Sequence, residues 1–199
     1  MSSLVDRERQ TLLEFARRAL IAAVEHREFL ETPPPDESLQ HPAGAFVTLR
    51  RRGRLRGCIG QLATADPLIQ VVAHCTRAAA LEDPRFEPVR PHELSELDIE
   101  LSVLSPLFAI TFDQIIIGRH GLLISCGWQR GVLLPQVAAE FGWSAERFLE
   151  ETCTKAGLGR DAWKHPDTQV EAFTAEVFSE ADFRYPARAP AKPGYSNST

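Results

Sequence analysis

The chain has 199 residues, of which 44% are hydrophobic and 25% are charged, proportions typical of a globular protein that buries a core of its own. Its 22 Lys and Arg are outnumbered by 27 Asp and Glu, and the formal net charge of −5 argues against broad binding to nucleic acid or to an anionic membrane. Neither a secretory signal pattern nor an apolar run of about twenty residues occurs, so we expect a cytoplasmic protein without a membrane segment.

The four cysteines lie far apart in the sequence, at positions 58, 75, 126 and 153. Zinc sites normally show close pairs of ligands, and nucleotide sites show glycine-rich motifs, but neither pattern occurs here. The sequence therefore predicts reduced, independent thiols, with no metal site and no cofactor.

The first predicted element is a long amphipathic helix. Ser3 followed by Asp6 resembles a capping box, and apolar residues between Leu12 and Val24 then recur at helical spacing. The prolines at positions 33–35 cannot continue a helix, and we expect them to end it.

A β-hairpin is predicted next, with strands at residues 46–51 and 55–60 and a tight connection between them. Side chains alternate along a strand, so Arg56 and Cys58 are expected to share the outer face while the neighbouring leucine and isoleucine anchor on the core. A guanidinium beside Cys58 would favour the thiolate, the reactive form of the side chain. The competing interpretation is a cysteine that serves only as a small buried hydrophobe.

A helix and a strand follow the hairpin. Asp66 with Pro67 is a strong helix start, the apolar stripe that follows includes Cys75, and the helix must end before Pro84. Apolar residues alternate with acidic or polar ones over residues 97–103, which predicts a half-buried strand with an acidic outer face.

The C-terminal half is predicted to contain a second hairpin, two helices and a last strand. The hairpin is predicted from strands at residues 122–126 and 132–134, joined by a turn at 127–131. The helices are predicted at residues 135–139 and from Ser144 to Gly157, and the last strand at residues 169–178. Residues 186–199 are rich in Pro, Ala and small polar residues, and we expect a flexible tail there. Paired strands with helices between the pairs indicate an α+β fold with a mixed or mainly antiparallel sheet.

Several of these segments resemble the AMMECR domain family, in the same order. The segments are residues 55–60, 83–86, 96–104, 120–121 and 134–137, and the first of them is the hallmark of that family. The resemblance is most specific over residues 46–178, and we expect a single domain over residues 1–185 with the tail outside it. It implies a larger and a smaller lobe with flanking helices, and a cleft near the hexapeptide.

The resemblance also implies a function. Prokaryotic members are similar to the first component of the AmmeMemoRadiSam system, in which an AMMECR protein occurs with a Memo-like protein and a radical-SAM enzyme. We therefore hypothesise a component of a multi-protein modification system that acts through a cleft lined by Arg56 and Cys58.

The first alternative is a free-standing enzyme in which Cys58 is the nucleophile or redox thiol and His120 exchanges protons with it. His120 precedes a glycine within the region of resemblance, but it could equally satisfy backbone groups at the start of a strand. A small anionic ligand would be bound by the cations and by the bare backbone of the glycines. The ligand-binding candidates are Arg56, Gly57, Gly60, Asp83 and Arg85.

The second alternative is an RNA- or nucleotide-binding module. Five guanidiniums form a basic patch, at Arg50, Arg51, Arg52, Arg54 and Arg56. Only Phe46 lies nearby to stack on a base, and no RNA-binding motif is present, so the sequence does not favour nucleic acid as a partner.

Overall fold

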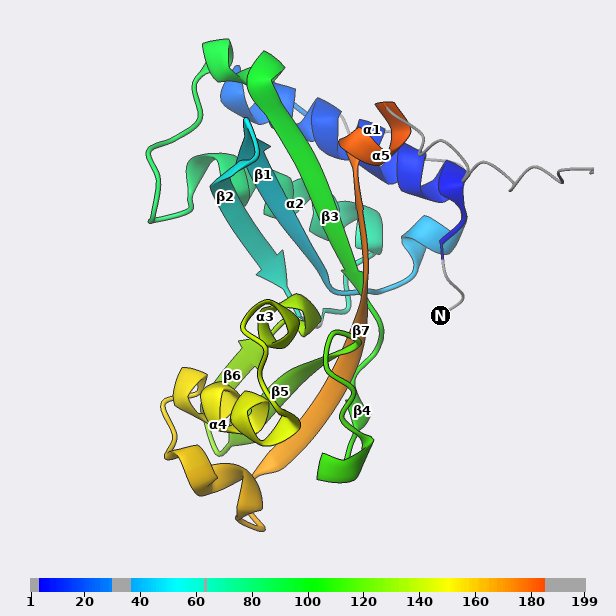
Figure 1. The fold of residues 1–199 in the computed structure, drawn as a ribbon. Helices are drawn as coiled ribbons and strands as arrows, with labels where there is room; N and C mark the ends of the chain where they lie inside the picture. The colour runs from blue at the N-terminus through cyan, green and yellow to red at the C-terminus, as the bar shows by residue number, and fades with distance from the viewer. Residues whose placement is uncertain (1–3, 30–36, 63, 185–199) are drawn as a thin grey trace, which may run out of the picture.

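The computed structural model describes residues 4–29, 37–62 and 64–184, which form a larger and a smaller lobe built on one sheet (Figure 1). The sheet has seven strands in the order β2-β1-β3-β7-β5-β6, with β4 beside β7. The strand pairs in these residues are antiparallel. The α+β class and the mainly antiparallel sheet that the sequence predicts are confirmed.

Helix α1 (Asp6–Val24) begins with a side-chain cap and ends with a backbone cap. Glu8 accepts a hydrogen bond from the Val5 N–H at 2.8 Å, whereas the predicted cap at Ser3 lies outside the described residues. The helix ends at Val24 because His26 adopts a left-handed φ of 54° and the following N–H turns back to the carbonyl of Ala22 at 2.8 Å. The prediction that the prolines at 33–35 end this helix is therefore wrong.

Strands β1 (Ala45–Arg51) and β2 (Arg54–Gln61) form the predicted first hairpin. Its turn consists of Arg52 and Gly53, with φ values of 51° and 77°. Left-handed conformations at both turn residues match the twist of a two-residue hairpin.

Helix α1 and helix α2 (Leu68–Leu81) cover one face of β1, β2 and β3 (Leu97–Leu104), as Figure 1 shows. Helix α2 begins one residue after the predicted start at Pro67. Alternate residues of the strands, such as Val47 and Ile99, are fully buried beneath these helices, together with Cys75. They form the core of the large lobe.

The small lobe contains β5 (His120–Cys126), β6 (Gln129–Leu133), α3 (Pro135–Glu140) and α4 (Ala145–Lys155). The predicted cap of α4 is confirmed, because the Ser144 hydroxyl accepts from the Arg147 N–H at 3.2 Å. The hairpin turn is Gly127 and Trp128, not residues 127–131, because Gly127 takes a left-handed φ of 58° and reverses the chain at once.

Strand β7 (Gln169–Ser179) belongs to both lobes. Its first half pairs with β5 and with β4 (Phe108–Ala109), and its second half pairs with β3. It contributes Phe178 to the core of the large lobe and Ala172 to a separate core in the small lobe.

Several short elements were not predicted. They are β4, α5 (Glu180–Arg184) and the 3-10 helices Glu37–Gln40, Pro91–Glu96, Phe112–Gln114 and Arg160–Lys164. None of the helices in the described part of the chain combines the length and the apolarity that crossing a bilayer requires.

Candidate functional site

The face of the large-lobe sheet opposite α1 and α2 carries a row of polar side chains. Thr48 on β1 pairs with Cys58 on β2 and with Glu100 on β3, and directly paired residues point to the same face of a sheet. The Thr48 hydroxyl donates a hydrogen bond to the Cys58 sulfur at 3.4 Å. Arg50 lies next along β1, and its guanidinium reaches Glu100 with two N–O distances of 3.4 Å. A thiol, a hydroxyl, a carboxylate and a guanidinium therefore lie side by side.

The backbone of Cys58 is held from the open edge of β2. Asp83 accepts a hydrogen bond from the Cys58 N–H at 2.8 Å, and the Arg85 guanidinium donates to the Cys58 carbonyl oxygen at 3.2 Å. Asp83 and Arg85 are themselves joined by N–O distances of 2.7 and 2.9 Å. We call these two residues the edge clamp, because they occupy the place of a neighbouring strand.

The edge clamp keeps its charge. The Arg85 hydrogen bonds hold the pKa of Asp83 far below its usual range, with further help from the Cys58 N–H and against the effect of burial. The guanidinium beside Cys58 in the structure is that of Arg85, whereas the sequence predicted that of Arg56.

Arg56 points to a different partner because β2 contains a β-bulge. Leu49 pairs with Gly57 but Arg50 pairs with Leu55, which leaves Arg56 as an extra residue in the strand. The predicted alternation of faces is therefore wrong on this side of the bulge, and Leu55 is 41% exposed where we expected a core anchor.

The Arg56 guanidinium is bound to a buried carboxylate. It donates to both oxygens of Glu93, at 3.1 and 3.0 Å, and to the Glu87 carbonyl oxygen at 2.9 Å. The hydrogen bonds from Arg56, helped by one from the Arg90 N–H and by the charges of Arg56 and Arg51, lower the pKa of Glu93 to about 2 against the effect of burial. Arg56 is therefore part of a structural ion pair at the edge of the lobe.

The two glycines of the hexapeptide are approached by the protein itself. A Cβ atom at Gly57 would collide with the carbonyl oxygen of Ala79 in α2, and one at Gly60 would collide with the ring of Phe46. From the sequence we expected another backbone or a ligand to approach closely at both positions. Packing of β2 against its neighbours accounts for the absence of a side chain at each.

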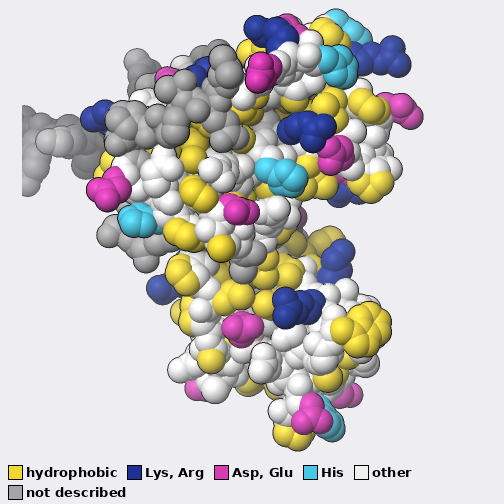
Figure 2. Space-filling model, turned by 180° about the vertical axis from the view of Figure 1, so that it is seen from behind, with side chains coloured by type: hydrophobic (Ala, Val, Ile, Leu, Met, Phe, Trp, Pro, Cys, Tyr) yellow, Lys and Arg dark blue, Asp and Glu magenta, His cyan; other side chains and the backbone are white. Residues whose placement is uncertain are grey.

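A hollow of about 340 Å³ separates the outward face of the large lobe from the small lobe. Its walls are formed by Arg50, Glu100, Ala175 and Val177 on one side and by Gly118, Pro135, Gln136 and Glu140 on the other. Seen from behind in Figure 2, the molecule narrows between the two lobes. Glu100 belongs both to the hollow and to the row that contains Cys58, and Thr48 on β1 lies between the hollow and the thiol.

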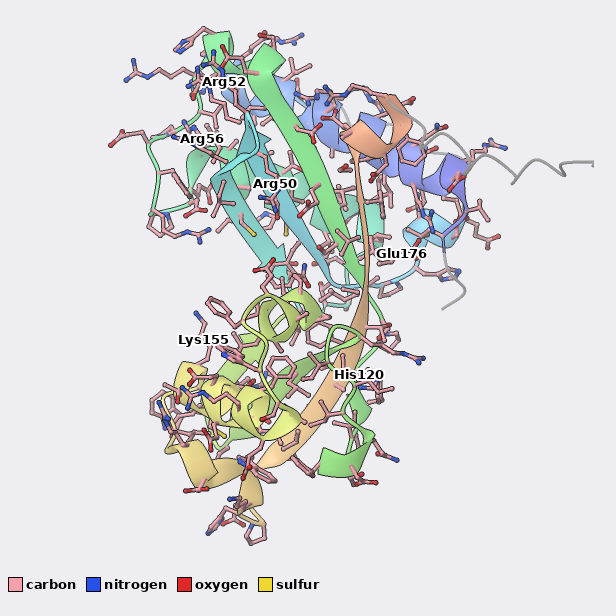
Figure 3. All side chains as sticks on the ribbon, in the orientation of Figure 1. Arg50, Arg52, Arg56, His120, Lys155 and Glu176 are labelled. Atoms are coloured by element: carbon pink, nitrogen blue, oxygen red, sulfur yellow. The ribbon has the colours of Figure 1, made fainter. Side chains whose placement is uncertain are left out.

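The structure does not bring His120 to Cys58. His120 pairs with Thr174 of β7, whereas Ala175 and Val177, which line the hollow, point to the opposite face of that strand. Figure 3 shows His120 in the small lobe, far from the labelled arginines of the hairpin.

The surroundings of His120 are those of a structural residue. Its Nδ1 accepts a hydrogen bond from the Ile116 N–H at 3.2 Å, and its ring meets the edge of Phe108. Burial, aided by Arg119, lowers the pKa of His120, so the ring is neutral at pH 7.

The basic patch of the hairpin is largely neutralised. Its ion pairs are Arg50 with Glu100, Arg51 with Glu93 and Glu96, Arg52 with Glu96, and Arg56 with Glu93. Among the described side chains, Arg54 is the one member of the patch without an ion pair. On the face shown in Figure 2, side chains of both signs are interspersed. Among the described residues, the hairpin arginines therefore offer Arg54 alone as a cation without an ion pair.

Within residues 4–29, 37–62 and 64–184, no three His, Cys, Asp or Glu side chains gather as metal ligands would. The residues that sequence reasoning missed are Thr48 and Glu93, each of which is an ordinary polar residue until the sheet register is known, whereas Glu100 was interpreted as part of a solvated strand face. The alternation over residues 97–103 did place Glu100 on an outer face, and that was the available signal.

Comparison with known proteins places the chain in a family. The AMMECR1 family model matches residues 13–178. The chain is 43% identical over 201 residues to Protein TK0174 of Thermococcus kodakarensis, covering 94% of this chain and 98% of that protein. It is also 43% identical over 182 residues to a protein of Methanothermobacter thermautotrophicus, covering 87% and 94%.

A solved structure agrees with this assignment. The crystal structure of protein PH0010 from Pyrococcus horikoshii matches with a TM-score of 0.79 and 40% identity, covering 85% of this chain and 90% of that one. The family model over residues 13–178 and the extent of these matches show that the chain belongs to the AMMECR1 family.

Proposed function

We propose that the chain acts through the cleft between its lobes, with Cys58 as the thiol that contacts the ligand, as a component of a multi-protein modification system. Memo-like and radical-SAM proteins are the partners that the family resemblance implies. The observation that carries the proposal is the edge clamp on Cys58, which fixes the backbone of a half-buried cysteine from both its N–H and its carbonyl.

A purely structural cysteine does not need such support. Cys75 and Cys153 are buried among apolar side chains, and burial raises the pKa of the Cys75 thiol to about 11, which makes it inert at neutral pH. Cys58 instead is half-buried, and its sulfur accepts a hydrogen bond from the Thr48 hydroxyl on the sheet face that carries Glu100 of the hollow. Exposure together with a fixed orientation is what a ligand-contacting thiol requires.

The proposal is tested by brief treatment of the full-length chain with iodoacetamide, followed by peptide mass spectrometry. Cys126 is the matched control, because it is the other half-buried cysteine and lies at a hairpin end in the small lobe. We expect Cys58 to be modified at least several-fold faster than Cys126, and to be protected when Memo-like and radical-SAM proteins of the same cell are added. Cys58→Ser should abolish cellular function.

Two results would overturn the proposal. One is alkylation of Cys58 no faster than that of Cys126, with no protection by either protein. The other is full cellular function of the Cys58→Ser variant.

A further inference from the structure

We infer that the hollow between the lobes binds a basic α-amino acid, with the carboxylate on Arg50, the α-ammonium on Glu100 and the distal cation on Glu140. This inference deepens the proposed function and rests on it, because it names the ligand class of the same cleft. It follows from the charges on the two walls and from the apolar side chains that share the lining with them.

The large-lobe wall presents a positive and a negative group side by side. Arg50 and Glu100 are joined only by N–O distances of 3.4 Å, and their side chains are 40% and 24% exposed. By contrast, Arg51 reaches Glu96 at 2.7 Å within the same hairpin region. An ion pair with long N–O distances and partly exposed side chains contributes little free energy. It can therefore separate at low cost, so that the guanidinium binds the carboxylate of a zwitterion and the carboxylate binds its ammonium.

The small-lobe wall presents a second negative group. Glu140 stands at the end of α3, is exposed, and lines the hollow across from Arg50 and Glu100. The charged groups of the lining are therefore one guanidinium and two carboxylates, so their formal charge is −1. A ligand with one carboxylate and two cationic groups neutralises all three.

Apolar side chains make up part of the lining. Val177, which is 48% exposed, and Ala175 lie on the β7 part of the wall, and Pro135 faces them from α3. An aliphatic chain that joins the two ends of the ligand would cover this surface and remove it from water. A hollow of about 340 Å³ lies within the size range of small-ligand sites.

The site shares a face of the sheet with the thiol. Cys58, Thr48 and Glu100 are paired across adjacent strands, and strands lie about 4.8 Å apart, so Cys58 is roughly 10 Å from Glu100 along the sheet. Thr48 on β1 therefore lies between the ammonium site at Glu100 and the thiol of Cys58.

The test is a titration of the full-length, isotope-labelled chain, followed by amide chemical shifts, with L-lysine and three analogues that each lack one group. L-norleucine lacks the distal ammonium, 6-aminohexanoate lacks the α-ammonium, and cadaverine lacks the carboxylate. We expect L-lysine to shift amides in β1, β3 and α3, and each analogue to bind at least about tenfold more weakly, since each loses one charge-assisted hydrogen bond.

Two variants assign the groups. Glu140→Gln, at an exposed position, should reduce L-lysine to the affinity of L-norleucine and leave L-norleucine unchanged. Arg50→Gln should remove the preference for L-lysine over cadaverine. The matched control is Arg52→Gln, which removes the same charge from the same hairpin outside the hollow and should leave L-lysine affinity within about twofold.

Three results would overturn the inference: equal binding of the four compounds, absence of saturable shifts, or an unchanged preference of Glu140→Gln for L-lysine over L-norleucine. The first two come from the unmodified chain, so they do not depend on the folding of a variant. Selective alkylation of Cys58 without L-lysine binding would overturn this inference alone and leave the proposed function standing. Tight L-lysine binding with an unreactive Cys58 would instead overturn the role of the thiol.

Discussion

The large lobe and the small lobe are halves of one sheet, yet they satisfy their buried polar groups in different ways. In the small lobe, His120 accepts from the Ile116 N–H and Thr152 donates to the Phe148 carbonyl, each four residues away in the chain, as Thr76 does to Val72 in the large lobe. In the large lobe the main partners are charged side chains from distant segments, such as Asp83 for Cys58 and Glu93 for Arg56, which are 25 and 37 residues away.

This difference shows that the large lobe depends on precise contacts between segments that are distant in the sequence. A polar group whose hydrogen-bond partner lies in its own turn keeps that bond however the turn is placed in the fold. The backbone of Cys58, by contrast, is bonded only when β2 packs correctly against the segment that follows α2. The edge clamp carries an ionised, almost fully buried carboxylate, which is costly to bury without partners. We therefore expect perturbations of the two lobes to differ in size and to remain separate.

The largest effect is expected from Asp83→Ala. The change leaves the Cys58 N–H without its acceptor and Arg85 without its partner, and we expect a loss of about 2–3 kcal/mol in the free energy of unfolding. Hydrogen exchange measured by mass spectrometry should show the lost protection in β2 and not in β5.

The control for this change is Asp161→Ala in the small lobe. Asp161 makes an exposed ion pair with Lys164, and its removal should leave the exchange pattern unchanged. If Asp83→Ala also behaved like the control, the edge clamp would not be a stabilising feature.

A second, intermediate effect is expected from alanine at one glycine of each lobe. A Cβ at Gly57 collides with the Ala79 carbonyl of α2, and one at Gly131 collides with the backbone N of Ala156. Each change should destabilise the chain by about 1–3 kcal/mol through overpacking.

Because the two cores are separate clusters, each alanine should raise hydrogen exchange only in its own lobe, and the double variant should show the sum. A Gly131→Ala change that loosened β2 as strongly as β6 would show that the lobes unfold as one unit.

The smallest effect is a difference in acid response. Because burial lowers the folded-state pKa of His120, the unfolded chain binds more protons as the pH falls below about 6.5, and the small lobe loses stability first. Glu93, with its pKa lowered to about 2, contributes stability above about pH 4.5 and loses it between there and about pH 2.

Exchange measured at pH 7, 5.5 and 3 should therefore show β5 loosening before β2. The His120→Asn variant should remove the first step, and Glu93→Gln should remove the later one. Loosening of β2 ahead of β5 on acidification would contradict this order.

Sequence patterns predicted the elements of the fold well, because each depends on nearby residues. Alternation over residues 97–103 and the caps at Ser144 and Gly157 were sufficient for β3 and α4. The end of α1 was not predicted, because His26 is not a residue that usually adopts a left-handed conformation.

The site depends on register, which the sequence does not show. A two-residue turn at Arg52 and Gly53 without a bulge would pair Thr48 with Gly57, but the extra residue Arg56 shifts the pairing to Cys58. The predicted neighbours Arg56 and Cys58 are therefore bound to Glu93 and to the edge clamp respectively, two contacts between distant segments.

Strand β7 has a mechanical consequence for the cleft. It is hydrogen-bonded on both flanks to strands of the two lobes, with Ala172 in one core and Phe178 in the other. Sliding one lobe along the other would break hydrogen bonds between β7 and its neighbouring strands, whereas bending β7 between Ala172 and Phe178 would not. The width of the cleft is thus governed by the curvature of a single strand, and a ligand that spans both walls works against the bending stiffness of that strand.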